Sequence, residues 1–310
     1  NFTREELARA AAFCHGRGVR LHVTVNTLLK DQELPQVLEF VAFLCSLPVD
    51  AVLVQDVGLF SLLRQRAPRL PLHASTQMSL HTPAGAKLLW ELGAQRVVLS
   101  REMSLGEIRE VGQACPVELE SFVHGALCMS VSGQCQLSAM LGGRSGNRGL
   151  CAQPCRLPFA APGGTGHDLS LKDLSFVREV GRLREAGVCS AKIEGRMKRP
   201  EYVWVVTKVY ADALREGRDP TAQELRALEE AFSRQGFTDG YYMRRKGPEM
   251  FGVRENTPEP RQLFAEARAA YEKGEGPGVP VTFYAMVRAG QPVQVGVEDR
   301  DGHVAAAQGP

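Results

Sequence analysis

The sequence has no long hydrophobic run and little net charge. Its most apolar region, residues 37–54, is interrupted by Glu39, Pro48 and Asp50, so it falls short of the ~20 apolar residues that span a membrane. The formal net charge is only +2, so a nucleic-acid partner would have to be held by local basic patches. Aromatic residues are scarce among the basic ones, which argues against a stacking platform for single strands. We expect no membrane association.

Several catalytic and targeting signatures are also missing. The sequence contains no H-E-x-x-H and no G-x-S-x-G, so it offers no familiar hydrolase machinery. No G-x-G-x-x-G turn follows an early strand, which disfavours a dinucleotide-binding sheet. The chain starts with Asn rather than Met, and no secretory leader pattern precedes its first helix. We therefore expect a piece of a longer, cytoplasmic protein.

Short apolar segments alternate with helical patterns along the first 217 residues. Hydrophobic residues make up 44% of the 310, which is enough to bury a substantial core. We expect strands at residues 20–26, 51–55, 70–75, 96–100, 117–124 and 190–194, and a seventh at 169–172. We expect helices at residues 3–16, 34–47, 58–65, 83–92, 105–111, 175–186 and 200–215. This alternation predicts an α/β protein with a parallel sheet.

The strand count favours a TIM-type eight-stranded (β/α) barrel that lacks its first one or two strands. A doubly wound open sheet is the main alternative. Residues 1–217 are expected to form the partial barrel, with a cysteine-rich insertion at 125–167. Residues 218–278 are expected to form a helical extension and linker. Alternating apolar and polar residues at 279–310 predict β-hairpins that begin a β-rich domain.

The cysteines are unevenly distributed. Four of the eight fall within 28 residues, namely Cys128, Cys135, Cys151 and Cys155. The other four stand apart in apolar or strand-like stretches, namely Cys14, Cys45, Cys115 and Cys189. Four clustered thiols can complete a zinc site or anchor a four-iron cluster, and the lack of paired C-x2-C knuckles favours iron–sulfur. Zinc, and four free core thiols, remain alternatives.

Polar side chains end almost every predicted strand. In a parallel barrel the catalytic and binding residues lie at the carboxyl ends of the strands. The polar residues at these strand ends therefore predict a pocket of mixed charge that binds a small anion. The substrate-binding candidates are Asn26, Gln55, His73, Ser75, Gln77, Arg144, Arg148, Lys172 and Arg196. The catalytic candidates are Glu120, His124, Lys192 and Glu194.

Two basic patches flank this predicted mouth. Residues 141–156 carry three arginines and no acid, and residues 192–199 carry four cations and one carboxylate. The ordinary interpretation of such patches is a solvated surface. Because the two patches flank the same mouth, they favour binding of phosphate or carboxylate groups.

Long motifs around the cysteines resemble a known family. They are ELESFVHGALCMSVSGQCQLS (118–138), RSGNRGLCAQPCR (144–156), LSLKDL (169–174) and KIEGRMKRPEYV (192–203). Together with PLHASTQMS (71–79) they resemble the collagenase-like peptidase family U32. The FTDGYY (237–242) and MFG (250–252) segments, followed by predicted hairpins, resemble its long form, which has an extra collagenase-type domain.

The resemblance implies a chemistry other than proteolysis. The better understood members of this family are iron–sulfur enzymes that hydroxylate RNA bases without molecular oxygen, and one branch hydroxylates the ubiquinone ring. The RNA substrates are a wobble uridine of transfer RNA or a cytidine of ribosomal RNA, and both reactions use prephenate. The resemblance assigns a 4Fe-4S cluster to Cys128, Cys135, Cys151 and Cys155, with Cys189 as an alternative ligand.

The predicted roles follow from this resemblance. Arg144, Arg148, Lys192 or Arg196 would clamp the two carboxylates of prephenate, a small dicarboxylate. Glu120, His124 and Glu194 would transfer protons. An RNA base would be extruded into the barrel mouth, and the long form favours the ribosomal branch. A collagenase-like peptidase and a metal-stabilised non-catalytic scaffold are the alternatives.

Overall fold

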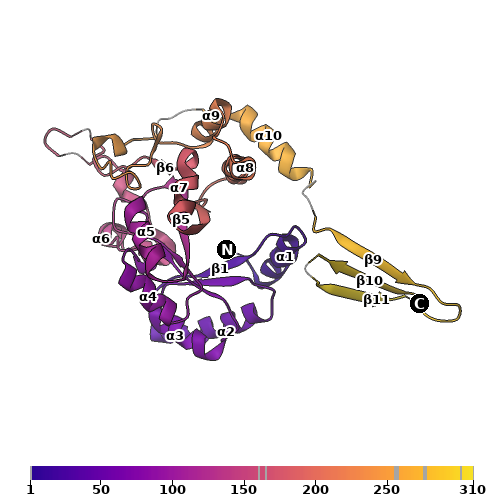
Figure 1. The fold of residues 1–310 in the computed structure, drawn as a ribbon. Helices are drawn as coiled ribbons and strands as arrows, with labels where there is room; N and C mark the ends of the chain where they lie inside the picture. Colours follow the sequence, from indigo (N-terminus) through magenta and orange to yellow (C-terminus); the bar gives the residue numbers. More distant parts are fainter. Residues whose placement is uncertain are drawn as a thin grey trace.

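The computed structural model describes residues 2–159, 161–164, 166–254, 258–274, 278–300 and 302–309. An eight-stranded sheet lies at its centre, and the first five strands are neighbours in chain order (Figure 1). They are β1 (His22–Val25), β2 (Ala51–Val54), β3 (Leu72–Ala74), β4 (Arg96–Val98) and β5 (Glu118–Ala126). All of these pairings are parallel, and β7 (Val188–Ile193) also pairs in parallel with β5.

The far edge of the sheet departs from the parallel pattern. β6 (Asp173–Ser175) runs antiparallel to the last residues of β5, and β8 (Phe237–Thr238) runs parallel to β6. Within the described residues the pairings run from β1 to β8 without returning to β1. The α/β class with a mostly parallel sheet is therefore confirmed, whereas the barrel stays a prediction. The strand expected at 169–172 lies a few residues later, in β6.

Helices alternate with these strands along the chain (Figure 1). They are α1 (Arg4–His15), α2 (Leu34–Cys45), α3 (Val57–Arg66), α4 (Pro83–Glu91), α5 (Leu105–Ala114), α7 (Val180–Glu185) and α8 (Pro200–Glu216). Capping boxes start α1 at Thr3 and α5 at Ser104. Asp56, directly after β2, accepts a hydrogen bond from the Leu59 amide and so begins α3.

A separate antiparallel sheet follows the last helices. After α9 (Ala222–Ala231) and α10 (Arg261–Glu272), β10 (Gln294–Asp299) pairs on one side with β9 (Val281–Met286) and on the other with β11 (Val304–Gln308). Figure 1 shows this sheet beyond α10, outside the main body. The expected β-hairpins are present, and the domain boundaries at 217 and 278 stay predictions.

The two faces of the large sheet differ in polarity. Register places His73 beside Arg96 and Val98 beside Glu120, and residues two apart in a strand share a face. His73, Arg96 and Glu120 therefore lie on one face, whereas the intervening Val97 points to the opposite face. Parallel strands are usually apolar on both faces, so the polar face indicates a functional surface.

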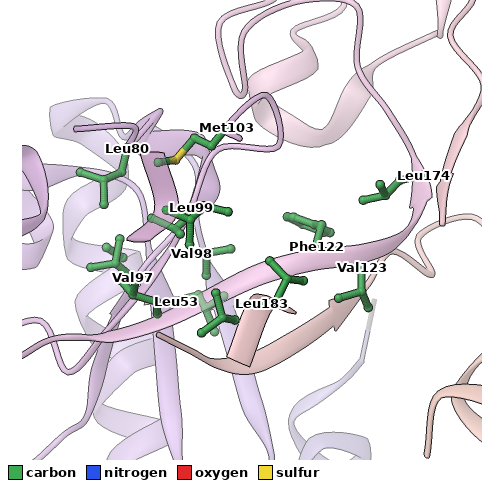
Figure 2. Packing of buried hydrophobic residues seen from close by; sticks show 14 of the residues in the cluster. Leu53, Leu80, Val97, Val98, Leu99, Met103, Phe122, Val123, Leu174 and Leu183 are labelled. Atoms are coloured by element: carbon green, nitrogen blue, oxygen red, sulfur yellow. The ribbon is translucent and has the colours of Figure 1, made fainter. Parts of the chain in front are cut away.

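The apolar side chains pack into one continuous core. Leu80, Leu99 and Met103 gather near the carboxyl end of β4, as Figure 2 shows, and each is at most 6% exposed. The same cluster continues through Leu119 to Leu183 of α7. The strand ends that carry the polar residues are thus fixed by packing underneath them.

Replacing Leu99 by alanine is expected to lower the free energy of unfolding by about 2–5 kcal/mol. Leu99 is fully buried, and the neighbouring strands cannot close the cavity left by the lost atoms. Urea unfolding of the variant would measure this loss. Leu88→Ala, at a position 57% exposed on α4, is the matched control and should change stability by less than about 1 kcal/mol. Equal losses in both variants would contradict the packing described.

Candidate active site

Glu120 holds together a buried cluster of charges on the polar face of the sheet. Its carboxylate accepts hydrogen bonds from Lys192 Nζ at 2.7 Å, Ser190 Oγ at 2.9 Å and Arg96 Nη1 at 3.2 Å. Register on β7 places Ser190 directly beside Glu120 and Lys192 beside Phe122. Two of the predicted catalytic residues, Glu120 and Lys192, are therefore in direct contact.

The surroundings of Glu120 keep it ionised. Burial alone would raise the pKa of Glu120, but the Lys192 ammonium and the hydrogen bonds from Lys192 and Ser190 hold it below its usual value. Both carboxylate oxygens already accept hydrogen bonds. A carboxylate in this state is a weak proton acceptor, so its chief effect is to position Lys192.

Arg101 and Glu194 form a second ion pair closer to the carboxyl ends of the strands. Arg101 Nη2 lies 3.1 Å from Glu194 Oε2, and the guanidinium lies 3.7 Å from the centre of the Phe122 ring. The Arg196 amide donates to the other Glu194 oxygen at 2.8 Å. Burial lowers the pKa of Arg101, and the nearby Cys128 interacts with its charge. Arg101 was noted among the polar residues that follow the predicted strands, but it was given no catalytic or substrate-binding role.

Polar side chains at the ends of β1, β2 and β3 meet as predicted. Asn26 Nδ2 donates to Ser75 Oγ at 3.3 Å, and Gln55 Nε2 donates to the Gln77 carbonyl at 3.3 Å. Gln77 Oε1 in turn accepts from Asn147 Nδ2 at 3.1 Å. Gln55 Oε1 is buried and has no hydrogen-bond partner in the described part of the chain. It is an acceptor available to a ligand.

The cysteine-rich insertion crosses over these strand ends. Arg148 forms an ion pair with Glu33 and donates to the Leu28 carbonyl at 2.9 Å. On the opposite side, Arg196 Nη2 donates to the Gly149 carbonyl at 2.8 Å. These contacts join the loop before α2 to the segment after β7. The insertion therefore lies across the carboxyl ends of these strands, whereas the barrel mouth itself stays a prediction.

The four clustered cysteines lie in this insertion as free thiols. Burial raises the pKa of Cys128, and the nearby Cys135 and Cys155 raise it further. Burial likewise raises the pKa of Cys155, with contributions from Cys151 and Cys135. Cys135 and Cys155 therefore lie near Cys128, and Cys151 and Cys135 lie near Cys155.

The chemistry of this donor set fits an iron–sulfur cluster. The insertion supplies four thiols, and none of them forms a disulfide. Cysteine thiolates are the usual ligands of such clusters. Among the described residues, no group of three or more His, Cys, Asp or Glu side chains is already arranged to hold a metal ion. The four cysteines are therefore the right residue types for an iron–sulfur cluster, while the cluster itself stays a proposal.

The His124 side chain lies among aromatic rings rather than in the ion pairs described above. Its ring packs against Tyr202, Tyr210 and Phe237, with Nδ1 3.4 Å from the Tyr210 hydroxyl. Burial, with a smaller effect of Lys198, lowers the pKa of His124 to about 3. Its neutral imidazole is thus enclosed by aromatic rings. The His124 carbonyl accepts from the Glu194 amide at 2.9 Å, but the described contacts include none between the His124 ring and the carboxylate of Glu120 or Glu194.

Other predicted residues are dispersed. The stem of Lys172 packs against the backbone at Gly252, so Lys172 lies apart from the group at Gln55. Arg144 is exposed and donates to the Leu150 carbonyl at 3.0 Å. Cys189 Sγ lies 3.4 Å from the Leu119 carbonyl oxygen, and its ionisation is coupled to Glu118 rather than to the clustered cysteines.

Acidification from pH 7 to pH 5 is expected to cost about 2 kcal/mol of stability for each of His73 and His124. Burial lowers their pKa values, to about 4 and about 3, so both stay neutral in the native protein. The unfolded chain takes up protons below about pH 6.5, so stability falls with pH from there. Urea unfolding at both pH values measures the loss. NMR titration of either ring near pH 6.5 in the folded protein would contradict this.

The sequence comparisons place the chain in a family. Residues 1–252 match the model of peptidase family U32, so this protein belongs to that family. The resemblance seen in the sequence motifs is thereby confirmed. None of the described helices is long and apolar enough to cross a membrane.

Several characterised relatives share substantial identity with the chain. The 23S rRNA 5-hydroxycytidine C2501 synthase of Escherichia coli is 39% identical, over 78% of this chain and 40% of that protein. The tRNA hydroxylation protein P1 of Bacillus subtilis is 35% identical, over 68% and 53%. A collagenase of Porphyromonas gingivalis is 32% identical, over 78% and 64%. The chain thus spans between 40% and 64% of the length of these relatives.

Proposed function

We propose that this protein is an iron–sulfur enzyme that hydroxylates a base of ribosomal or transfer RNA, with prephenate as co-substrate. One observation supports the proposal: four free thiols lie in one insertion, with Cys128 close to the buried Arg101, in a chain whose relatives are named for rRNA and tRNA hydroxylation. Converting a ring C–H into C–OH is a two-electron oxidation, which amino-acid side chains alone do not perform.

The four clustered cysteines, Cys128, Cys135, Cys151 and Cys155, would hold a 4Fe-4S cluster. When bound, such a cluster supplies electron transfer. Arg101, buried beside Cys128 and paired with Glu194, would offset the negative charge that thiolates bring. Glu194 is also less buried than Glu120, with its side chain 25% exposed against 8%. Both oxygens of Glu194 also accept hydrogen bonds, from Arg101 and the Arg196 amide, so its greater exposure alone makes it the more accessible candidate for proton transfer.

The substrate side of the mouth combines amides with exposed cations. An RNA base has to leave its stack to enter a pocket, and the buried Gln55 Oε1 is an acceptor for its N–H groups. Arg144 and Arg196 have no carboxylate partner in the described part of the chain, so they are available for phosphates or for the carboxylates of prephenate. Arg148 and Lys192 are less suited, because Glu33 and Glu120 already pair with them.

Proteolysis is the second candidate, because one relative is named a collagenase. A thiol or hydroxyl peptidase needs a nucleophile hydrogen-bonded to a base. Among the described contacts no cysteine thiol or serine hydroxyl is hydrogen-bonded to a histidine ring, since His81 contacts only the Ser79 carbonyl, and His124 is enclosed by aromatic rings. The geometry therefore favours the hydroxylase.

Mass spectrometry of RNA nucleosides tests the proposal. We expect a strain that lacks the gene to lose one hydroxylated cytidine or uridine, and a plasmid copy to restore it. Protein purified without air should be brown and lose its colour in air, as four-iron clusters do. An unchanged nucleoside profile, together with cleavage of gelatin by the pure protein, would favour the peptidase instead.

A further inference from the structure

Met197 is both highly exposed and held in a strained backbone conformation. Its side chain is 89% exposed, the highest value among the large hydrophobic side chains of the described residues. Its φ is 60°, in the left-handed region that favours glycine. Met197 is the third residue of a turn between β7 and α8, which the Lys198 amide closes onto the Gly195 carbonyl at 3.0 Å. Glycine would fit this position without strain, so the large apolar side chain calls for a role of its own.

The residues around Met197 anchor this turn on both sides. Arg196 Nη2 donates to the Gly149 carbonyl in the cysteine-rich insertion at 2.8 Å. The Lys198 ammonium lies over the Phe232 ring, and Arg199 forms an ion pair with Glu259. The turn therefore holds the exposed side chain of Met197 in a fixed place beside the insertion.

Helix α1 exposes two aromatic rings on the other side of an open hollow. This hollow, of about 1060 Å³, extends from α1 to the turn at Met197, and we call it the α1 hollow. Phe2 precedes α1 and Phe13 lies in its last turn, and their side chains are 72% and 60% exposed. The lining residues are Phe2, Glu6, Arg9, Ala10, Phe13, Cys14, Arg196, Met197 and Lys198. Folding thus brings together aromatic rings and cations that lie far apart in the sequence.

The α1 hollow carries uncompensated positive charge. Arg9, Arg196 and Lys198 line it, together with a single carboxylate, that of Glu6. Glu6 already serves the capping box of α1, where it accepts from the Thr3 amide at 2.7 Å. Among the ion pairs of the described residues, none joins any of these three cations to a carboxylate. An apolar tip, aromatic rings and free cations therefore share one surface.

We propose that Met197 is a wedge that inserts between two adjacent bases of a single-stranded RNA, with the strand held along the α1 hollow. Apolar side chains, methionine among them, part neighbouring bases in nucleic-acid complexes. Exposed rings such as Phe13 stack on bases, and cations neutralise the phosphates, both without reading the sequence. The inference rests on the proposed RNA substrate, because a base has to leave its stack before it enters a pocket.

The chemistry of the surface favours an RNA strand over a protein partner. The core of a protein-docking patch is usually apolar and depleted of charged residues. Here Arg196 and Lys198 directly flank Met197, so the apolar tip lies within positive charge. Alternating apolar and cationic groups match the alternation of bases and phosphates along a strand.

Fluorescence of a short single-stranded RNA with 2-aminopurine at its centre tests the wedge in the full chain. Stacking quenches 2-aminopurine, so the wild-type protein should raise its fluorescence at saturation. Met197→Gly should remove most of this rise and weaken binding at least about fivefold, the loss expected for one stacking contact. Met197→Leu should restore both. Met140→Ala, at a position 80% exposed on α6 (Leu137–Gly142), is the matched control and should behave like wild type.

Two further measurements separate this role from a structural one. Met197→Gly should keep the Tm or raise it by up to about 2 °C, because glycine relieves the backbone strain. It should also leave the slope of log Kd against log salt unchanged, since an apolar side chain releases no counter-ions. Arg9→Gln, in contrast, should reduce that slope by about 1.

Three results would overturn the proposal. The first is binding of the RNA by the wild-type protein without a rise in fluorescence, and the second is a full rise with Met197→Gly. The third is the absence of RNA binding, which would leave a protein as the partner of this surface. If the rise depends on Met197 while a strain without the gene keeps all its hydroxylated nucleosides, the hydroxylation is refuted and the wedge is not.

Discussion

Cys151→Ala is expected to remove the bound iron and to lower hydroxylation by more than about 100-fold, because loss of even an outer-shell partner of a metal ligand costs about 10–100-fold. Cys151 is exposed, and its thiol contacts only Ser138 Oγ at 3.8 Å and the Gln153 amide at 3.3 Å among described groups. The substitution should therefore leave the fold intact. Iron content and absorbance of anaerobically purified protein, together with nucleoside analysis of RNA, measure the effect.

The chain offers two matched controls for this variant. Cys45, at the end of α2, and Cys189, in β7, are also exposed free thiols. Cys45→Ala and Cys189→Ala should retain both iron and activity. If Cys151→Ala stays brown and active, the ligand assignment is wrong. Loss of iron in Cys189→Ala but not in Cys151→Ala would identify Cys189 as the fourth ligand.

Much of the fold could be predicted because its signals are local. The strand at Ala51–Val54 is a continuous apolar segment, and Asp56, two residues after it, caps the next helix. Thr3 and Ser104 carry capping boxes that are readable from four residues each. Such short-range patterns fix the start of an element regardless of its tertiary surroundings.

The antiparallel β6 could not be predicted, because its direction depends on distant partners. Asp173 begins β6 and forms a buried ion pair with Arg234, which lies 61 residues later in the chain. β6 also pairs with β8, a strand of only two residues at Phe237–Thr238. No periodicity marks so short a strand. The departure from regular parallel order therefore arises from tertiary pairing.

The candidate site was likewise predictable only where its features depend on local sequence. Sequence patterns identified the polar strand ends and the four clustered cysteines, since both follow directly from residue type and position. They did not show that Glu33, 115 residues before Arg148, already neutralises that arginine. Nor did they show that His124 lies among aromatic rings. Whether a charged side chain is free or paired is decided by long-range packing, which spacing alone does not encode.

Glu120→Gln is expected to lower the free energy of unfolding by about 3 kcal/mol, the lower end of the cost of leaving a buried charge unpaired. Lys192 loses its counter-ion, whereas Arg96 keeps Glu118 at 2.7 Å. Urea unfolding at pH 7 measures the loss. Glu118→Gln, 53% exposed and also paired with Arg96, is the matched control and should cost less than about 1 kcal/mol. Adding Lys192→Met to Glu120→Gln should recover part of the loss.

The pH dependence of this loss separates a structural from a catalytic Glu120. The pKa of Glu120 is lowered in the folded protein, so its contribution to stability is present above about pH 4.5 and disappears as pH falls through the folded pKa. The difference between wild type and Glu120→Gln should shrink accordingly in acid. If Glu120 is instead the proton acceptor, Glu120→Gln will unfold like wild type at every pH and lose kcat alone. Coincident loss of stability and activity would identify it as the residue that positions Lys192.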